Sequence, residues 1–105
     1  MAQETVDFQD LKDLKFKIGH MNCQVHQRQF GFDDFWVEFK LNKTFMLSWE
    51  HSNRLVTLLR FKKGSEYSIE ERIPVKNLEE VRKYLYVFGH LTKEQYSSTN
   101  IYSAA

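Results

Sequence analysis

The sequence predicts an α+β domain in which a four- to five-stranded antiparallel meander sheet carries one C-terminal helix on its apolar face. Between residues 35 and 73, apolar and polar residues alternate with the two-residue period of strands, and short polar turns separate four such runs. After residue 77 the apolar spacing changes to that of a helix. A short N-terminal helix is expected as well. All 105 residues are assigned to one globular domain, with a loose tail over 97–105.

The composition restricts the classes of partner and the compartment. Fifteen Lys and Arg against fourteen Asp and Glu give a net charge of +1, so we expect neither a nucleic acid nor a membrane as the partner. The single cysteine cannot form an internal disulfide, which fits a reducing compartment. Because no signal peptide or membrane-spanning run is visible, we expect a cytoplasmic protein.

Residues 5–14 have the features of a short helix. Thr5 is suited to be the N-cap, and Asp7 falls in the first turn, where the helix dipole favours negative charge. The apolar residues of this segment share one helix face: Phe8, Leu11 and Leu14.

Two imidazoles and the only thiol stand close together in "GHMNCQVHQ" (19–27), with the spacing H-x2-C-x2-H. In an extended chain His20 and His26 share a face about 20 Å apart, whereas Cys23 points the opposite way. We therefore expect one bent strand or two short strands within 15–32, with Cys23 as a buried thiol, and no metal site. The polar side chains here indicate either a solvated edge strand or a recognition edge.

The first hairpin has a register that the apolar pattern determines. A three-residue loop over 42–44 pairs Phe39 with Leu47 and Val37 with Trp49, which keeps every apolar residue on one face. A two-residue loop would divide the apolar residues between the two faces. The longer loop is therefore predicted.

The same reasoning extends the sheet to residue 73. It pairs Trp49 with Leu55 around one turn and Phe61 with Tyr67 around the next. Pro74 is expected to end the sheet, because proline cannot donate a ladder hydrogen bond.

A helix over 78–88 has the strongest signals in the chain. Asn77 is the expected N-cap, with Glu80 three residues on, and Gly89 is the expected C-terminal stop. A last short helix is expected from Thr92. The apolar residues of the main helix recur at helical spacing: Leu78, Val81, Leu85 and Phe88.

The predicted register places Glu71 on the apolar face, opposite Thr57. Because a buried carboxylate is costly unless it is paired, Glu71 either reaches water at the end of the sheet or anchors a pocket between sheet and helix. Such a pocket would bind a small, partly apolar molecule. Its other lining residues would be Trp49, Thr57, Tyr67 and Tyr84, with His51 at the rim.

On the other face of the predicted sheet a second apolar group appears. The register pairs Met46 with Leu58 and Ser48 with Val56. Either the N-terminal helix covers this face, or it is exposed and contacts a protein partner or a second copy of the chain. The expected interface residues are Trp36, Met46, Val56 and Leu58.

A run of basic and aromatic residues surrounds the last predicted hairpin, where Arg60, Lys62 and Lys63 lie near Phe61 and Tyr67. Sheets that bind RNA expose their aromatic residues, whereas the predicted register puts Phe61 and Tyr67 on the core face. We therefore interpret this hairpin tip as solvated.

These observations favour a non-enzymatic protein-interaction domain of the inhibitor, immunity or adaptor type, which binds a partner or itself through a sheet face or edge. The alternative is a small-ligand-binding or simple enzymatic domain with a pocket anchored by Glu71. Because the sequence contains no glycine-rich phosphate loop, HExxH, GxSxG or CxxC motif, we assign no catalytic residue, metal ligand or cofactor.

Overall fold

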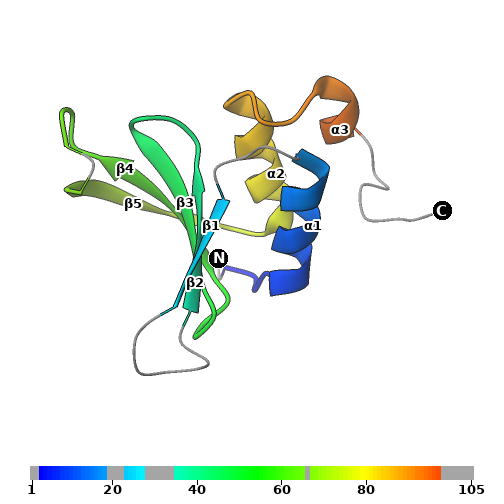
Figure 1. The fold of residues 1–105 in the computed structure, drawn as a ribbon, viewed down its shortest axis with the longest axis horizontal. Helices are drawn as coiled ribbons and strands as arrows, with labels where there is room; N and C mark the ends of the chain where they lie inside the picture. Colours follow the sequence, from blue (N-terminus) through cyan, green and yellow to red (C-terminus); the bar gives the residue numbers. More distant parts are fainter. Residues whose placement is uncertain (1–2, 19–22, 28–34, 66, 98–105) are drawn as a thin grey trace.

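The chain folds as the α+β domain that the sequence predicts. A computed structural model describes residues 3–18, 23–27, 35–65 and 67–97. Five antiparallel strands form a meander in the order β1-β2-β3-β4-β5, and the three helices lie together on one side of the sheet (Figure 1). The elements are α1 (Phe8–Ile18), β1 (Cys23–Gln27), β2 (Phe35–Lys40), β3 (Phe45–Glu50), β4 (Val56–Phe61), β5 (Ile69–Val75), α2 (Leu78–Val87) and α3 (Lys93–Ser97).

The N-terminal helix is displaced from its predicted range. It begins at Phe8, directly after Asp7, and not after Thr5. It continues to Ile18, where the sequence predicts extended chain, and Ile18 also lies at helical spacing from Leu11 and Leu14. The predicted apolar face is confirmed: Leu11 and Leu14 are fully buried, and Phe8 packs against the core.

Hydrogen bonds join the segment before α1 to the start of β4, the end of β5 and the loop that precedes β4. The Val6 N–H donates to the Arg54 carbonyl at 2.8 Å. The Gln3 side chain donates through Nε2 to the carbonyls of Val56 and Val75, at 2.8 and 3.1 Å. These bonds hold the N-terminal segment against β4 and β5 and so determine where α1 enters the helix layer.

β1 confirms that part of the segment 15–32 is a strand. It pairs antiparallel with β2 at one edge of the sheet, with Cys23 opposite Phe39 and Val25 opposite Val37. His20 and the rest of the predicted bent strand, up to residue 32, lie outside the described residues.

The register of the first hairpin is confirmed. Phe39 lies opposite Leu47 and Val37 opposite Trp49, around the three-residue loop over 42–44. Asn42 shapes this loop, because its Oδ1 accepts hydrogen bonds from two backbone N–H groups within three residues, at 2.7 and 2.8 Å.

The register of the second hairpin differs from our prediction by one residue. Trp49 lies opposite Val56, not Leu55. The loop is longer because Arg54 adopts a left-handed backbone conformation, with φ of 56°. A one-residue slip moves every side chain of a strand to the other face. Val56 and Leu58, which we had placed on the opposite face, therefore lie in the core.

The last strand also departs from the prediction. Phe61 lies opposite Ile69, not Tyr67, and an irregularity interrupts the register between Arg60 and Phe61. Pro74 does not end the sheet but lies within β5, opposite Thr57. The structure tolerates this proline because β5 is an edge strand.

Trp49 is the centre of the core on the helix side. Its side chain is 1% exposed, and its indole Nε1 donates to the Val6 carbonyl at 2.7 Å. The Phe8 ring stacks on the indole at a centroid distance of 5.7 Å, and Phe35 lies at the same distance. One aromatic cluster thus joins α1 to β2 and β3.

The signals predicted for α2 are confirmed, although the helix ends one residue early. The Asn77 side chain accepts from the Glu80 N–H at 3.1 Å, and Gly89 has the left-handed φ of 83° expected after the C-cap. Thr92 and Gln95 cap α3 reciprocally, with bonds of 3.1 and 2.8 Å. None of the described helices is long and apolar enough to cross a membrane.

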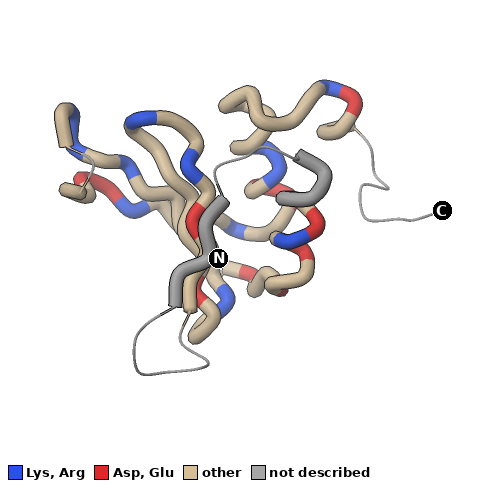
Figure 2. Tube along the Cα trace, in the orientation of Figure 1, with Lys and Arg blue, Asp and Glu red and all other residues tan. Residues whose placement is uncertain are grey.

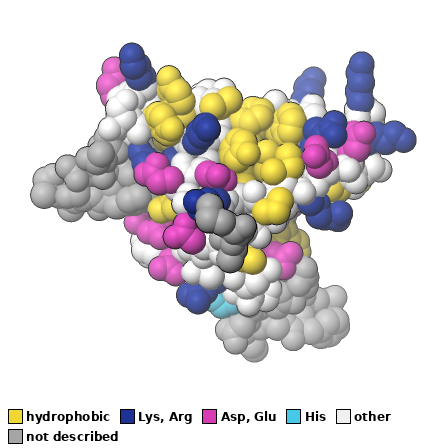
Figure 3. All heavy atoms as spheres, turned by 180° about the vertical axis from the view of Figure 1, so that it is seen from behind, with side chains coloured by type: hydrophobic (Ala, Val, Ile, Leu, Met, Phe, Trp, Pro, Cys, Tyr) yellow, Lys and Arg dark blue, Asp and Glu magenta, His cyan; other side chains and the backbone are white. Residues whose placement is uncertain are grey.

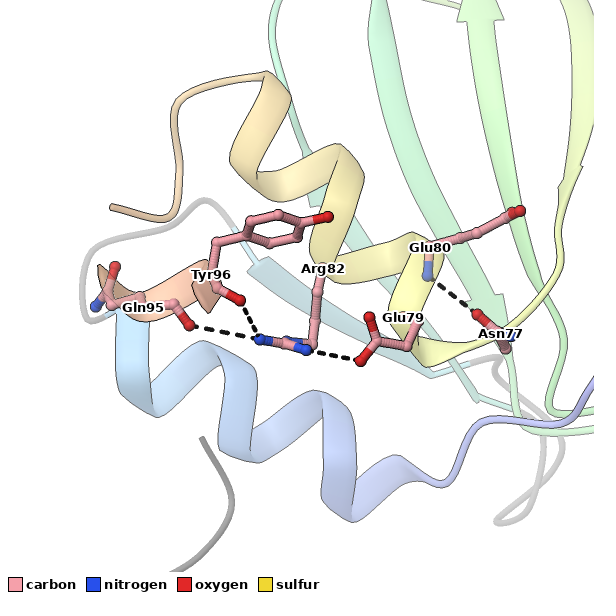
Figure 4. Close-up of polar contacts among 6 residues, drawn as sticks. All are labelled: Asn77, Glu79, Glu80, Arg82, Gln95 and Tyr96. Atoms are coloured by element: carbon pink, nitrogen blue, oxygen red, sulfur yellow. Dashed lines mark hydrogen bonds and ion pairs between the residues drawn. The ribbon is translucent and has the colours of Figure 1, made fainter. Parts of the chain in front are cut away.

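A buried arginine joins α2 to α3. Arg82 is 6% exposed, and Figure 4 shows it between the Glu79 carboxylate and the α3 backbone. Its Nη1 donates to Glu79 Oε1 at 2.9 Å and its Nη2 to the Tyr96 carbonyl at 2.7 Å. The rings of Tyr86 and Tyr96 stack at 4.5 Å alongside it. Arg82 is therefore a structural residue.

The first turn of α1 contains an acidic group that gives stability a specific pH dependence. Burial raises the pKa of the Asp10 carboxyl above 3.8, and the charges of Asp7 and Asp13 raise it further. Because the folded state holds this proton more tightly than the unfolded state, Asp10 lowers stability as pH rises through the raised pKa. We expect Asp10→Asn to increase the free energy of unfolding at neutral pH but not well below 3.8. Urea denaturation at both pH values measures this, and an equal effect at both would contradict it.

Candidate functional site

None of the described helices covers the side of the sheet opposite the helix layer (Figure 1). Apolar side chains line hollows on this side. We call this side the outer face. Its central positions alternate with the core positions of β2, β3 and β4. The apolar outer-face residues are Trp36, Met46, Leu55, Leu59, Phe61 and Ile69.

Two hollows extend along the outer face. One, of about 340 Å³, lies toward the hairpin tips, and the other, of about 290 Å³, toward the opposite end of the sheet. Leu59 and Ile69 line both hollows, which therefore adjoin each other, and we call the two together the groove. The first also contains Met46, Phe61 and Tyr67. The second contains Trp36 and is more polar, with lining residues Ser48, Glu50, Thr57 and Arg72.

The predicted anchor of the sheet-and-helix pocket is not where we expected it. Glu71 lies opposite Arg60, not Thr57, and forms an ion pair with it at 3.0 Å between Oε1 and Nε. Its side chain is half exposed, in agreement with the alternative that this carboxylate reaches water.

The other residues assigned to that pocket lie on different sides of the sheet. Thr57 and Tyr67 line the outer-face hollows, and Tyr67 is 89% exposed. Trp49 and Tyr84 pack in the core on the helix side. His51 stacks on a core aromatic ring, Phe35, at 4.5 Å, and no described group hydrogen-bonds its buried Nδ1. The structure does not bring these residues together as one ligand pocket.

The predicted interface is divided in the same way. Trp36 and Met46 line the groove of the outer face, whereas Val56 and Leu58 are each 3% exposed in the core. Since α1 packs on the helix side, it does not cover Met46. Four outer-face residues were not predicted, because of the one-residue slip in β4 and the shift of β5: Leu55, Leu59, Phe61 and Ile69.

The basic residues of the sheet gather at the tips of two hairpins. A third hollow, of about 400 Å³, lies between the β2–β3 and β4–β5 loops and is lined by Lys43, Lys62 and Lys63. Figure 2 shows Lys and Arg at both tips. In the view from behind, hydrophobic side chains gather near the centre, and basic side chains stand at the hairpin end (Figure 3).

The described residues contain no group of three or more His, Cys, Asp or Glu side chains that could hold a metal ion. The chain matches no family model, no curated protein and no solved structure.

Proposed function

We propose that this chain is a non-enzymatic interaction domain, of the inhibitor, immunity or adaptor type, that binds another protein or a second copy of itself through the outer face. The observation that supports the proposal is the gathering of apolar side chains, half-buried except for the buried Leu59, on the side of the sheet that no described helix covers. Contiguous apolar surface of this kind marks contact sites in soluble proteins.

The face is better suited to binding than the β5 edge of the sheet. An unpaired edge strand could add a strand from a partner, but charges and proline discourage such pairing. β5 carries Pro74 and a run of exposed charged residues, Glu70, Glu71 and Arg72. Of these two surfaces, the outer face is therefore the one across which we expect the partner to lie.

The composition of the groove supports a contact role. Trp and Met are enriched at the centre of protein interfaces, and the groove contains Trp36 and Met46. A large apolar side chain contributes about 1.5–3 kcal/mol of free energy when it goes from fully exposed to fully buried. Completing the burial of several such side chains therefore contributes to the binding free energy. Glu50 and Arg72 at one end of the groove can form the polar rim.

Met46→Glu tests the proposal, because it places a charge in the middle of the groove. We expect it to weaken the association by at least about tenfold, since burying an unpaired carboxylate costs more than 1.4 kcal/mol. Val87→Glu is the matched control, because Val87 is 65% exposed on α2, away from the outer face. Sedimentation over a wide concentration range measures self-association, and mass spectrometry identifies proteins that co-purify with the tagged chain.

The proposal predicts that wild type and Val87→Glu behave alike and that Met46→Glu loses the association. If all three chains stay monomeric and co-purify with the same proteins, the outer face is not the contact surface. Circular dichroism confirms that each variant is folded.

A further inference from the structure

Four exposed lysines lie at the hairpin end of the outer face. The side chains of Lys40, Lys43, Lys62 and Lys63 form no ion pair or hydrogen bond with any described residue. The neighbouring Arg60 differs, because it forms ion pairs with Glu71 at 3.0 Å and with Glu70 at 3.6 Å. The hairpin end therefore presents four exposed lysines that pair with no described carboxylate, with Glu38 lining the same hollow as Lys40 and Lys43.

The two loops that carry these lysines are held together and have defined conformations. The Phe61 N–H donates to the Thr44 carbonyl at 2.8 Å, which links the two hairpins. In the second loop Gly64 adopts a left-handed φ of 84°, and the Ser65 hydroxyl accepts from two backbone N–H groups at 3.0 and 3.2 Å. The hollow between the loops has a volume of about 400 Å³. The described backbone that carries its basic lining is therefore held by hydrogen bonds before any ligand binds.

Aromatic side chains lie directly beside the lysines. Lys43 lines both the loop hollow and the neighbouring hollow of about 340 Å³, in which Phe61 and Tyr67 also lie. Tyr67 is 89% exposed, so its ring is available to a ligand. The predicted register, which buries both rings, argues against RNA binding. The observed register of β4 and β5 removes that objection.

We propose that the hairpin end of the outer face binds single-stranded nucleic acid. The four lysines contact backbone phosphates, and Phe61 and Tyr67 stack against bases. Lysine is depleted at protein interfaces, whereas phosphates attract it, so this charge pattern favours a nucleic acid over an acidic protein. The net charge of +1 does not oppose such binding, because three of the four lysines lie together around one hollow. The inference does not rest on the proposed protein contact.

Fluorescence anisotropy with labelled oligo(dT) and oligo(rU), each about ten nucleotides long, tests this inference. If all four lysines contact phosphates, the logarithm of the binding constant should fall with the logarithm of salt concentration with a slope of about −3, since each contact contributes about −0.7. Absence of binding to both oligonucleotides at low salt would overturn the inference.

Charge reversal identifies the site. Lys62→Glu combined with Lys63→Glu should weaken binding by at least about tenfold and reduce the salt slope, because two phosphate contacts are lost. Lys83→Glu combined with Lys93→Glu makes the same change in net charge at exposed positions on α2 and α3. This control should bind as wild type does. An equal loss in both double variants would overturn the site.

Removing the exposed ring separates stacking from charge. Tyr67→Ala should weaken binding about fivefold to a hundredfold without changing the salt slope, and Tyr67→Phe should retain wild-type binding. Two competitors test whether the site is a general anion site. The assignment to single-stranded nucleic acid is overturned if a duplex of the same length binds as tightly. It is also overturned if poly-L-glutamate at equal charge displaces the oligonucleotide equally well.

Discussion

Trp49→Ala is expected to lower the free energy of unfolding by about 3–5 kcal/mol, the range for removing a large buried aromatic residue. The indole is 1% exposed and packs between the rings of Phe8 and Phe35. The substitution also leaves the Val6 carbonyl without its 2.7 Å hydrogen bond, so α1 should loosen along with the sheet. Urea denaturation followed by circular dichroism measures the change.

Two further variants separate packing from hydrogen bonding. Trp49→Phe keeps an aromatic ring in the core but removes the donor to Val6, and should therefore recover part of the loss. Trp36→Ala is the matched control on the outer face, where the side chain is only half buried, and should cost less than Trp49→Ala. If Trp36→Ala were the more destabilising of the two, the assignment of inner and outer faces would be wrong.

Leu85→Ala should lower the free energy of unfolding by about 2–5 kcal/mol. Leu85 is 0% exposed and belongs to the core cluster on the inner side of α2. The shortened side chain would leave a cavity between this helix and the sheet. Alanine is a better helix former than leucine, so helix propensity does not account for the loss of stability.

Val87→Ala is the control for the same helix, because Val87 is 65% exposed two residues further along. It should change stability by less than about 0.5 kcal/mol. Similar unfolding curves for Leu85→Ala and Val87→Ala would show that α2 does not pack on the sheet through Leu85.

The sequence was sufficient for the elements whose signals are local. Asn77 and Gly89 mark the ends of α2 through hydrogen bonding and positive φ, which depend on only a few neighbouring residues. The first hairpin was predictable because only one loop length places Phe39 and Leu47 on the same face.

The register of β4 could not be inferred in this way. It depends on Arg54, which has a left-handed backbone although arginine carries no preference for that region. A loop one residue shorter gave an equally apolar face through Leu55 and Leu59, so the hydrophobic pattern did not decide between the two. The additional loop residue reverses the two faces of β4, so the predicted pocket and the predicted interface were both misplaced.

The position of Pro74 illustrates a different limit. A proline can stay within a strand only at the edge of a sheet, and which strand lies at the edge depends on the order of all five.

The attachment of residues 3–6 affects when the chain can fold during synthesis. Gln3 bonds to carbonyls 53 and 72 residues further along, and Val6 to that of Arg54. Ribosomes make the N-terminal end first, so α1 emerges long before the strands that receive it. An isolated helix of 11 residues is marginal in water. Stable docking of α1 must therefore wait until β4 and β5 have left the exit tunnel, so the first helix to be made is among the last elements to be fixed in place.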